Sequence, residues 1–177
     1  MGRGMTVSSL PILVYGNPVL RRRAKPVTSI SPGLKHLADD MLESMYESNG
    51  IGLAAPQIGE SLRLIVVDVS GGEGKQKQPY VMFNPTLLAS RGKMVAEEGC
   101  LSVPEVWADV VRPEIITVQA LDREGKPFEL KNIDGLLARC IQHEIDHLEG
   151  VLFVDKISAT DRVFNEAKLK KMVRQNR

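Results

Sequence analysis

The chain has 177 residues, 43% hydrophobic and 25% charged, a length typical of one domain and a composition that excludes disorder and collagen-like repeats. Its 23 basic and 22 acidic residues give a formal charge of +1, which argues against a surface devoted to nucleic acid. No apolar run approaches the ~20 residues that span a bilayer, and no signal-peptide core follows the N-terminus. We therefore expect one soluble, cytoplasmic domain over residues 1–177 that binds neither membrane nor DNA, and whose two cysteines are reduced thiols.

The predicted elements change from helical to extended and back along the chain. Apolar residues at helical spacing after Ser31 and Pro32, stopping at Asn49 and Gly50, predict a helix over residues 32–48. Short aliphatic and β-branched runs then predict antiparallel strands at 64–69, 80–88, 115–121 and 128–130, with a polar glycine-rich hairpin connection at 71–78. Helical spacing returns at 134–149, before a short strand at 151–154 and a last helix from about 160 to 175 in a C-terminal segment of 160–177. The expected fold class is α+β, with an antiparallel strand-rich centre packed around a central helix and flanked by an N-terminal and a C-terminal helix.

The central predicted helix carries a metal-binding pattern. His143, Glu144 and His147 spell H-E-x-x-H, in which two imidazoles one turn apart can bind one divalent ion with the glutamate beside it. At ~100° per residue these three residues share a sector with Cys140, apart from an apolar sector and from a polar sector that includes Arg139. An ordinary amphipathic helix needs no separate titratable sector, so the pattern favours a metal site over two structural histidines.

A catalytic zinc-type site needs a third protein ligand, and no histidine follows His147. A cysteine thiolate is a strong candidate. Cys140 lies about 7 to 8 Å along the helix axis from the midpoint of the two imidazoles, so we expect that it does not reach. Cys100 directly follows a glycine and shortly precedes a proline, where a strand edge can present a thiolate. A small buried side chain is the alternative at Cys100 and the preferred interpretation at Cys140.

Three blocks of sequence now stand together: GIGLAAPQIG at 50–59, EEGCLSVP at 97–104 and QHEIDHLEG at 142–150. In this order and spacing they resemble the signature motifs of the peptide deformylase family, and the similarity extends from Tyr15 to Asp155. The resemblance implies a hydrolase that removes the formyl group from the N-terminal formylmethionine of newly synthesised proteins. It also implies Cys100, His143 and His147 as ligands of one divalent metal, ferrous iron in the cell, with zinc or nickel able to occupy the site.

The resemblance assigns roles to further residues. It implies that Glu144 moves the proton and that the Gln57 amide and the Leu101 backbone N–H stabilise the oxyanion, a task in which one donor is worth ~10²–10³ in rate. Trp107 follows the second block, and two roles remain possible for it: a lid over the substrate or an aromatic residue packed in the core. Arg139 stands where many members carry an aliphatic residue, which would make the rim of the pocket more polar. The residues implied around the methionine side chain are Ile51, Gly52, Glu98, Gly99, Leu136, Arg139 and Cys140.

Several alternatives remain at this point. A protease that uses H-E-x-x-H on internal peptide bonds is one, and a metal-binding or ribosome-associated module without enzymatic activity is another. The last predicted helix has six basic residues against two acidic ones, net +4. A run of charges on a helix most often forms a solvated face. The resemblance implies a second possibility, that this helix docks the enzyme on the ribosome. An organellar compartment is the alternative to the cytoplasm if a transit segment was removed.

Overall fold

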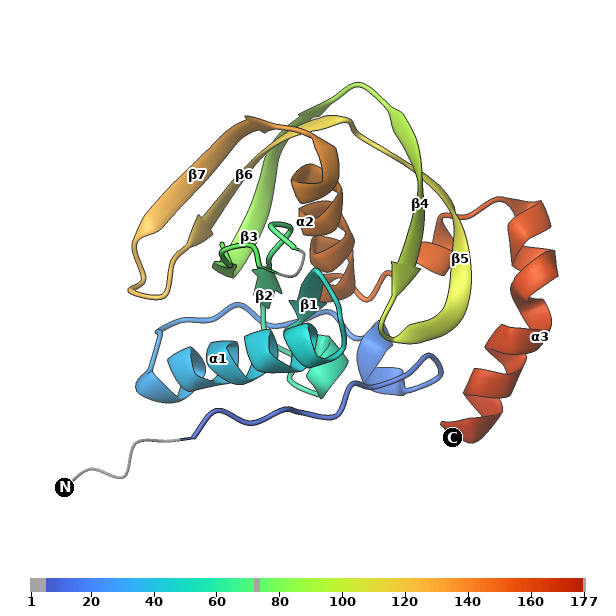
Figure 1. The fold of residues 1–177 in the computed structure, drawn as a ribbon, viewed down its shortest axis with the longest axis horizontal. Coiled ribbons are helices and arrows are strands. Elements are labelled where there is room, and N and C mark those ends of the chain that lie inside the picture. Colours follow the sequence, from blue (N-terminus) through green and yellow to red (C-terminus); the bar gives the residue numbers. More distant parts are fainter. Residues whose placement is uncertain (1–5, 72–73, 177) are drawn as a thin grey trace.

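The computed structural model describes residues 6–71 and 74–176. These residues form two antiparallel sheets and three α-helices (Figure 1). The predicted α+β class is therefore confirmed. In chain order the elements are α1 (Pro32–Glu47), β1 (Gly52–Ala54), β2 (Leu64–Val67), β3 (Tyr80–Arg91), β4 (Met94–Cys100), β5 (Val103–Arg112), β6 (Ile115–Leu121), β7 (Pro127–Ile133), α2 (Gly135–Leu148) and α3 (Ala159–Gln175), with short 3-10 helices at Pro18–Arg21, Ala55–Ile58 and Phe153–Asp155.

The larger sheet has the strand order β1-β2-β3-β6-β7, and helices cover both of its faces. Alternation along β2 explains this: Ile65 and Val67 pack with apolar residues of α2, whereas Leu64 and Val66 pack with those of α1. Figure 1 shows α1 below β1 and β2, with α2 standing among the strands. None of the helices in the described ranges is both long and apolar enough to cross a membrane.

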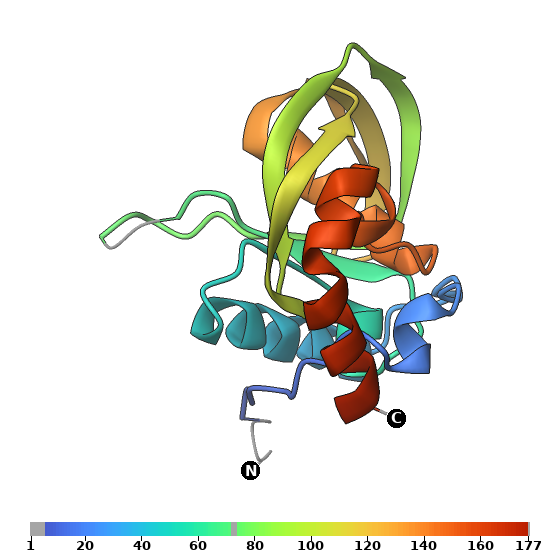
Figure 2. The same ribbon diagram turned by 90° about the vertical axis from the view of Figure 1, so that its right-hand side faces the viewer.

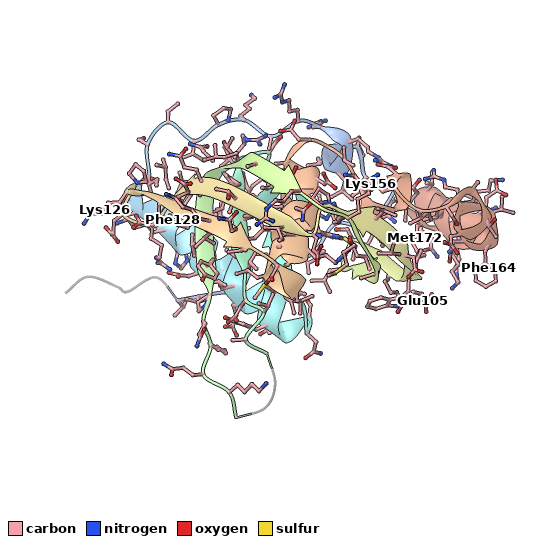
Figure 3. The ribbon with its side chains drawn as sticks, turned by 90° about the horizontal axis from the view of Figure 1, so that it is seen from above. Glu105, Lys126, Phe128, Lys156, Phe164 and Met172 are labelled. Carbon is pink, nitrogen blue, oxygen red and sulfur yellow. The ribbon has the colours of Figure 1, made fainter. Side chains whose placement is uncertain are left out.

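The smaller sheet is the β4–β5 ribbon, which follows β3 through a turn where Gly92 has a φ of 73°. β5 alternates between buried and exposed residues, and its buried side chains pack with Leu169 and Met172 of α3. Figure 2 shows α3 lying in front of this ribbon, and Figure 3 shows Met172 on the side of α3 near it. No strand pairing joins the ribbon to the larger sheet within residues 6–71 and 74–176. Short turns connect the ribbon to β3 and β6, and hydrogen bonds between Arg139 of α2 and Glu98 of β4 and between Arg112 of β5 and Asp146 of α2 hold it against the helix.

The predicted helices, and the strands at 64–69, 80–88 and 128–130, are found with shifted ends, and the strand at 115–121 is found with the predicted bounds. The predicted hairpin at 71–78 does join β2 to β3, although residues 72 and 73 lie outside the described ranges. The predicted strand at 151–154 is wrong: the segment enters the 3-10 helix Phe153–Asp155. There the Asp155 carboxylate accepts a hydrogen bond from the Leu152 N–H at 2.9 Å, which closes a turn instead of leaving the backbone extended.

Candidate active site

Three potential metal ligands converge between α2 and the end of β4. The ligand atoms of Cys100, His143 and His147 all lie within 4.8 Å of one another, and Cys100 Sγ is 3.3 Å from His147 Nε2. Donors that each bind one ion at about 2.0–2.3 Å in a tetrahedral site lie roughly 3.5 Å apart. The group can therefore hold a metal ion with small adjustments of its side chains.

The end of β4 explains how Cys100 reaches the helix. The register of β4 and β5 shifts between Glu98 and Cys100, and Cys100 pairs with Val103 across the turn that ends the ribbon. Cys100 is two residues after Glu98, whose carboxylate contacts His143 of α2, so alternation along β4 directs the thiol to the same side. Cys140 lies outside the ligand group: it is buried, and its thiol donates a weak bond to the Ile51 carbonyl at 3.5 Å.

Glu98 fixes the orientation of one ligand. Its carboxylate is 5% exposed and accepts a hydrogen bond from His143 Nδ1 at 2.8 Å, which leaves Nε2 of that ring for a metal. Arg112 donates to both carboxylate oxygens, from Nε at 2.6 Å and from Nη2 at 2.9 Å. Burial alone would raise the pKa of Glu98, but the hydrogen bonds from His143 and Arg112 hold it well below its ordinary value. Glu98 is therefore an ionised anchor for His143.

Arg139 completes the cluster around Glu98. Its Nη1 donates to Glu98 Oε2 at 2.6 Å and to the Val110 carbonyl at 3.0 Å, and Nη2 donates to the Met94 carbonyl at 2.8 Å. The polar sector predicted for α2 therefore faces the β4–β5 ribbon, and Arg139 is buried there. Sequence reasoning missed Arg112, whose only signal is a charged residue at a buried position in the alternation of β5.

Glu144 is buried beside the ligands. Burial raises its pKa to about 7, against the opposing positive charges of His143 and Arg112. Its Oε2 atom and His147 Nδ1 are the buried side-chain polar atoms of the described residues that have no hydrogen-bond partner. An unpaired buried carboxylate oxygen that borders a cavity points to a water, an ion or a substrate there.

Gln57 approaches the ligands from the opposite wall. It lies in the 3-10 helix Ala55–Ile58, where its Oε1 accepts from the Ala54 N–H at 2.9 Å. Its Nε2 donates to Ser102 Oγ at 3.0 Å and lies 3.6 Å from Cys100 Sγ. Ser102 is fully buried and was not singled out from the sequence. The amide of Gln57 is thus held beside the metal group with an N–H directed toward it.

A cavity of about 490 Å³ opens above these groups. Within the described residues, β1 pairs only with β2 and β4 only with β5, so both strands have a free edge, and residues of both border the cavity. Trp107 is 64% exposed, which excludes a packed core aromatic. All of the residues expected around a methionine side chain line this cavity, namely Ile51, Gly52, Glu98, Gly99, Leu136, Arg139 and Cys140.

A cysteine and two histidines placed to hold a metal, with a buried glutamate at the base of a cavity, define a metal-dependent hydrolase. The family model described as polypeptide deformylase matches residues 9–163. The chain therefore belongs to the polypeptide deformylase family, as its motifs predicted.

Individual relatives agree over nearly the whole chain. A peptide deformylase of Alkalilimnicola ehrlichii is 49% identical over 168 residues, covering 95% of this chain and 93% of the relative. The crystal structure of a peptide deformylase from Legionella pneumophila, 48% identical, has a TM-score of 0.86 and covers 95% of this chain and 97% of its own. A plant peptide deformylase structure, 35% identical, has a TM-score of 0.90 with coverages of 97% and 93%. The chain is thus a hydrolase of protein biosynthesis that removes the N-formyl group from new proteins.

Proposed function

We propose that Cys100, His143 and His147 hold one divalent metal and that Glu144 transfers the proton when the formyl amide of an N-formylmethionyl peptide is hydrolysed. The observation that carries this proposal is one juxtaposition. Three ligand atoms lie within 4.8 Å of one another, beside a buried carboxylate oxygen without a partner. A thiolate with two imidazoles suits iron, nickel or zinc, and ferrous iron is the ion that we propose for the cell. When bound, the ion supplies Lewis acidity, which makes water a better nucleophile at neutral pH.

The protein's own groups account for the remaining chemistry. Glu144 accepts a proton from the attacking water and delivers it to the departing amine, so that the C–N bond breaks and formate and a free N-terminus leave. A carboxyl with a pKa of about 7 suits both tasks near neutral pH. The Gln57 amide and the Leu101 backbone N–H donate to the oxygen on which negative charge develops.

The two free strand edges account for peptide binding. A formylated peptide lies extended between β1 and β4 and makes backbone hydrogen bonds to both. The methionine side chain then enters the cavity toward Leu136 and Cys140 on α2. The guanidinium of Arg139 is engaged by Glu98 and two backbone carbonyls, which leaves its methylene stem to face the methionine.

The decisive variant is Glu144→Gln, which keeps the size of the side chain but removes the base. We expect it to retain metal and to release formate from a formyl-Met peptide ~10²–10⁴-fold more slowly. Metal content by elemental analysis and formate release, measured together, separate chemistry from metal loss. New amino termini from an unformylated internal-peptide substrate would instead support the protease alternative. Full activity of the variant would remove Glu144 from the mechanism.

We also propose that residues 1–177 act as one domain and that α3 docks the enzyme on the ribosome. Single-domain behaviour rests on α2 and α3, which pack against the two sheets, and predicts one cooperative thermal transition.

For the ribosome, the support is the charge of α3: Lys171 and Arg174 form no ion pair within the described ranges, and Phe164 is 79% exposed (Figure 3). Replacing Lys171 and Arg174 by glutamate should abolish salt-dependent cosedimentation with ribosomes, whereas Lys126→Glu, in the turn before β7, should not. Equal cosedimentation of both variants would reject this role.

A further inference from the structure

Trp107 lies close against Gly99, and both residues line the cavity. A Cβ atom on Gly99 would stand 2.5 Å from the indole ring, so only glycine allows this approach. The ring is nevertheless 64% exposed, so packing alone does not account for it. Both residues border the cavity described above. Trp107 therefore forms an exposed aromatic wall beside the place where a bound peptide would lie.

A pair of like charges lies next to this wall. Glu97 of β4 and Asp109 of β5 are direct partners in the ribbon, and both are exposed. Like charges directly opposite one another destabilise a sheet. Neither carboxylate is joined to a cation by any ion pair among the residues that the structure describes. A cation placed between them would relieve this repulsion.

The alternation of an extended peptide decides which side chain meets this surface. Along β4, Glu98 faces α2, whereas Glu97 and Gly99 face the opposite side. If the methionine side chain points toward α2, the side chain of the next residue points the other way. That residue therefore meets Trp107 and the two carboxylates.

We propose that Trp107, Glu97 and Asp109 form a subsite that selects lysine or arginine immediately after the formylmethionine. The aliphatic stem of such a side chain packs on the indole, and its cationic end lies over the ring and near the two carboxylates. This inference rests on the proposed function, because it needs the methionine side chain bound against α2. It adds a preference to an activity that requires only the formylmethionine.

The test compares formyl-Met peptides whose second residue is lysine, norleucine or glutamate. Norleucine has the stem of lysine without its charge. We expect kcat/KM to be about two- to fivefold higher for lysine than for norleucine, and lower again for glutamate, with the differences in KM. Because the groups are exposed, 0.5 M salt should reduce the advantage of lysine. Equal values for lysine and norleucine, or for lysine and glutamate, would overturn the proposal.

Variants assign the effect to these residues. Trp107→Ala and the double variant Glu97→Gln with Asp109→Asn should each reduce the lysine-to-norleucine ratio toward one. Glu129→Gln, an exposed acid on β7 away from the cavity, should leave the ratio unchanged. An unchanged ratio in both test variants would refute the subsite even if the wild-type preference exists.

Binding gives a readout that does not depend on catalysis. Trp107 is the only tryptophan in the chain, so its fluorescence reports on this surface directly. In Glu144→Gln, the lysine peptide should change the emission and bind two- to fivefold more tightly than the norleucine peptide, about the strength of one exposed cation–π contact. Fluorescence binding with no formate release by the wild-type enzyme would count against the proposed chemistry alone. Formate release without any discrimination in binding would count against the subsite alone.

Discussion

Gly52 lies where β1 meets α2, and adding one methyl group there should misplace the groups that carry the chemistry. A Cβ atom at this position would be 2.6 Å from Cys140 Sγ and 2.6 Å from Glu144 Oε1, whereas ordinary contact begins at 3.4 Å. Gly52→Ala therefore forces a displacement of about 0.8 Å. A misplacement of about 1 Å costs up to a hundredfold in rate, so we expect kcat/KM to fall about 10- to 100-fold. Overpacking should also cost about 1–3 kcal/mol of stability.

Formate release, metal content and thermal unfolding, measured on one preparation, test this expectation. Metal content should stay close to that of the wild type, because none of the three ligand residues lies among the nearest atoms at Gly52. Gly33→Ala on α1 is the matched control: its nearest atom, Ser31 Oγ, would be 3.7 Å away. That variant should keep full activity. A Gly52→Ala enzyme within twofold of wild-type kcat/KM would refute the steric reasoning.

Three further predictions rest on the hydrogen bonds of two carboxylates, Glu98 and Asp155. Glu98→Gln should speed metal loss to a chelator about 10- to 100-fold, because the carboxylate that orients His143 is gone; unchanged loss would contradict that role. Arg139→Met should have a smaller effect, under about tenfold, because Arg112 and His143 still hold Glu98. Burial alone would raise the pKa of Asp155, but hydrogen bonds from Arg21 lower that pKa in the folded protein. The ionised carboxylate therefore stabilises the fold at pH values above the ordinary carboxyl pKa, and this stabilisation is lost as the pH falls through the lower pKa of the folded state. Asp155→Asn should thus lower Tm at pH 7 and lose this effect near pH 2; a constant difference in Tm would argue against it.

The central helix could be predicted from the sequence because its signal is local. The spacing of His143 and His147 places both rings on one face wherever the helix lies, and angular position alone groups them with Glu144. The third donor, Cys100, is 43 residues away from His143 along the chain; thiolate chemistry made it a candidate, and the resemblance to a family implied it as the ligand. Its placement depends on how the β4–β5 ribbon packs against α2, a long-range contact for which local sequence gives no periodic signal.

The β4–β5 ribbon could not be predicted from the pattern of residues. One face of the ribbon carries Glu97, Gly99 and Trp107, and this mixture of residue types hides the alternation of a strand, so neither β4 nor β5 was predicted. Strand β1 was not predicted either, because it has only three residues. The polar sector of α2 was expected as a third face apart from the apolar core, but a second sheet covers it. Arg139 therefore pairs with Glu98, 41 residues away, and such a contact depends on how two sheets pack rather than on local sequence.

The shortness of β1 has a consequence for how widely the enzyme can act. Its edge spans Gly52–Ala54, so a peptide bound along it as proposed would be held at little more than its first residues. Main-chain hydrogen bonds carry no information about side chains, and a grip made from them treats very different proteins alike. A slot of this length would admit the products of many genes, and any preference beyond formylmethionine would come from side chains beside it, such as Trp107.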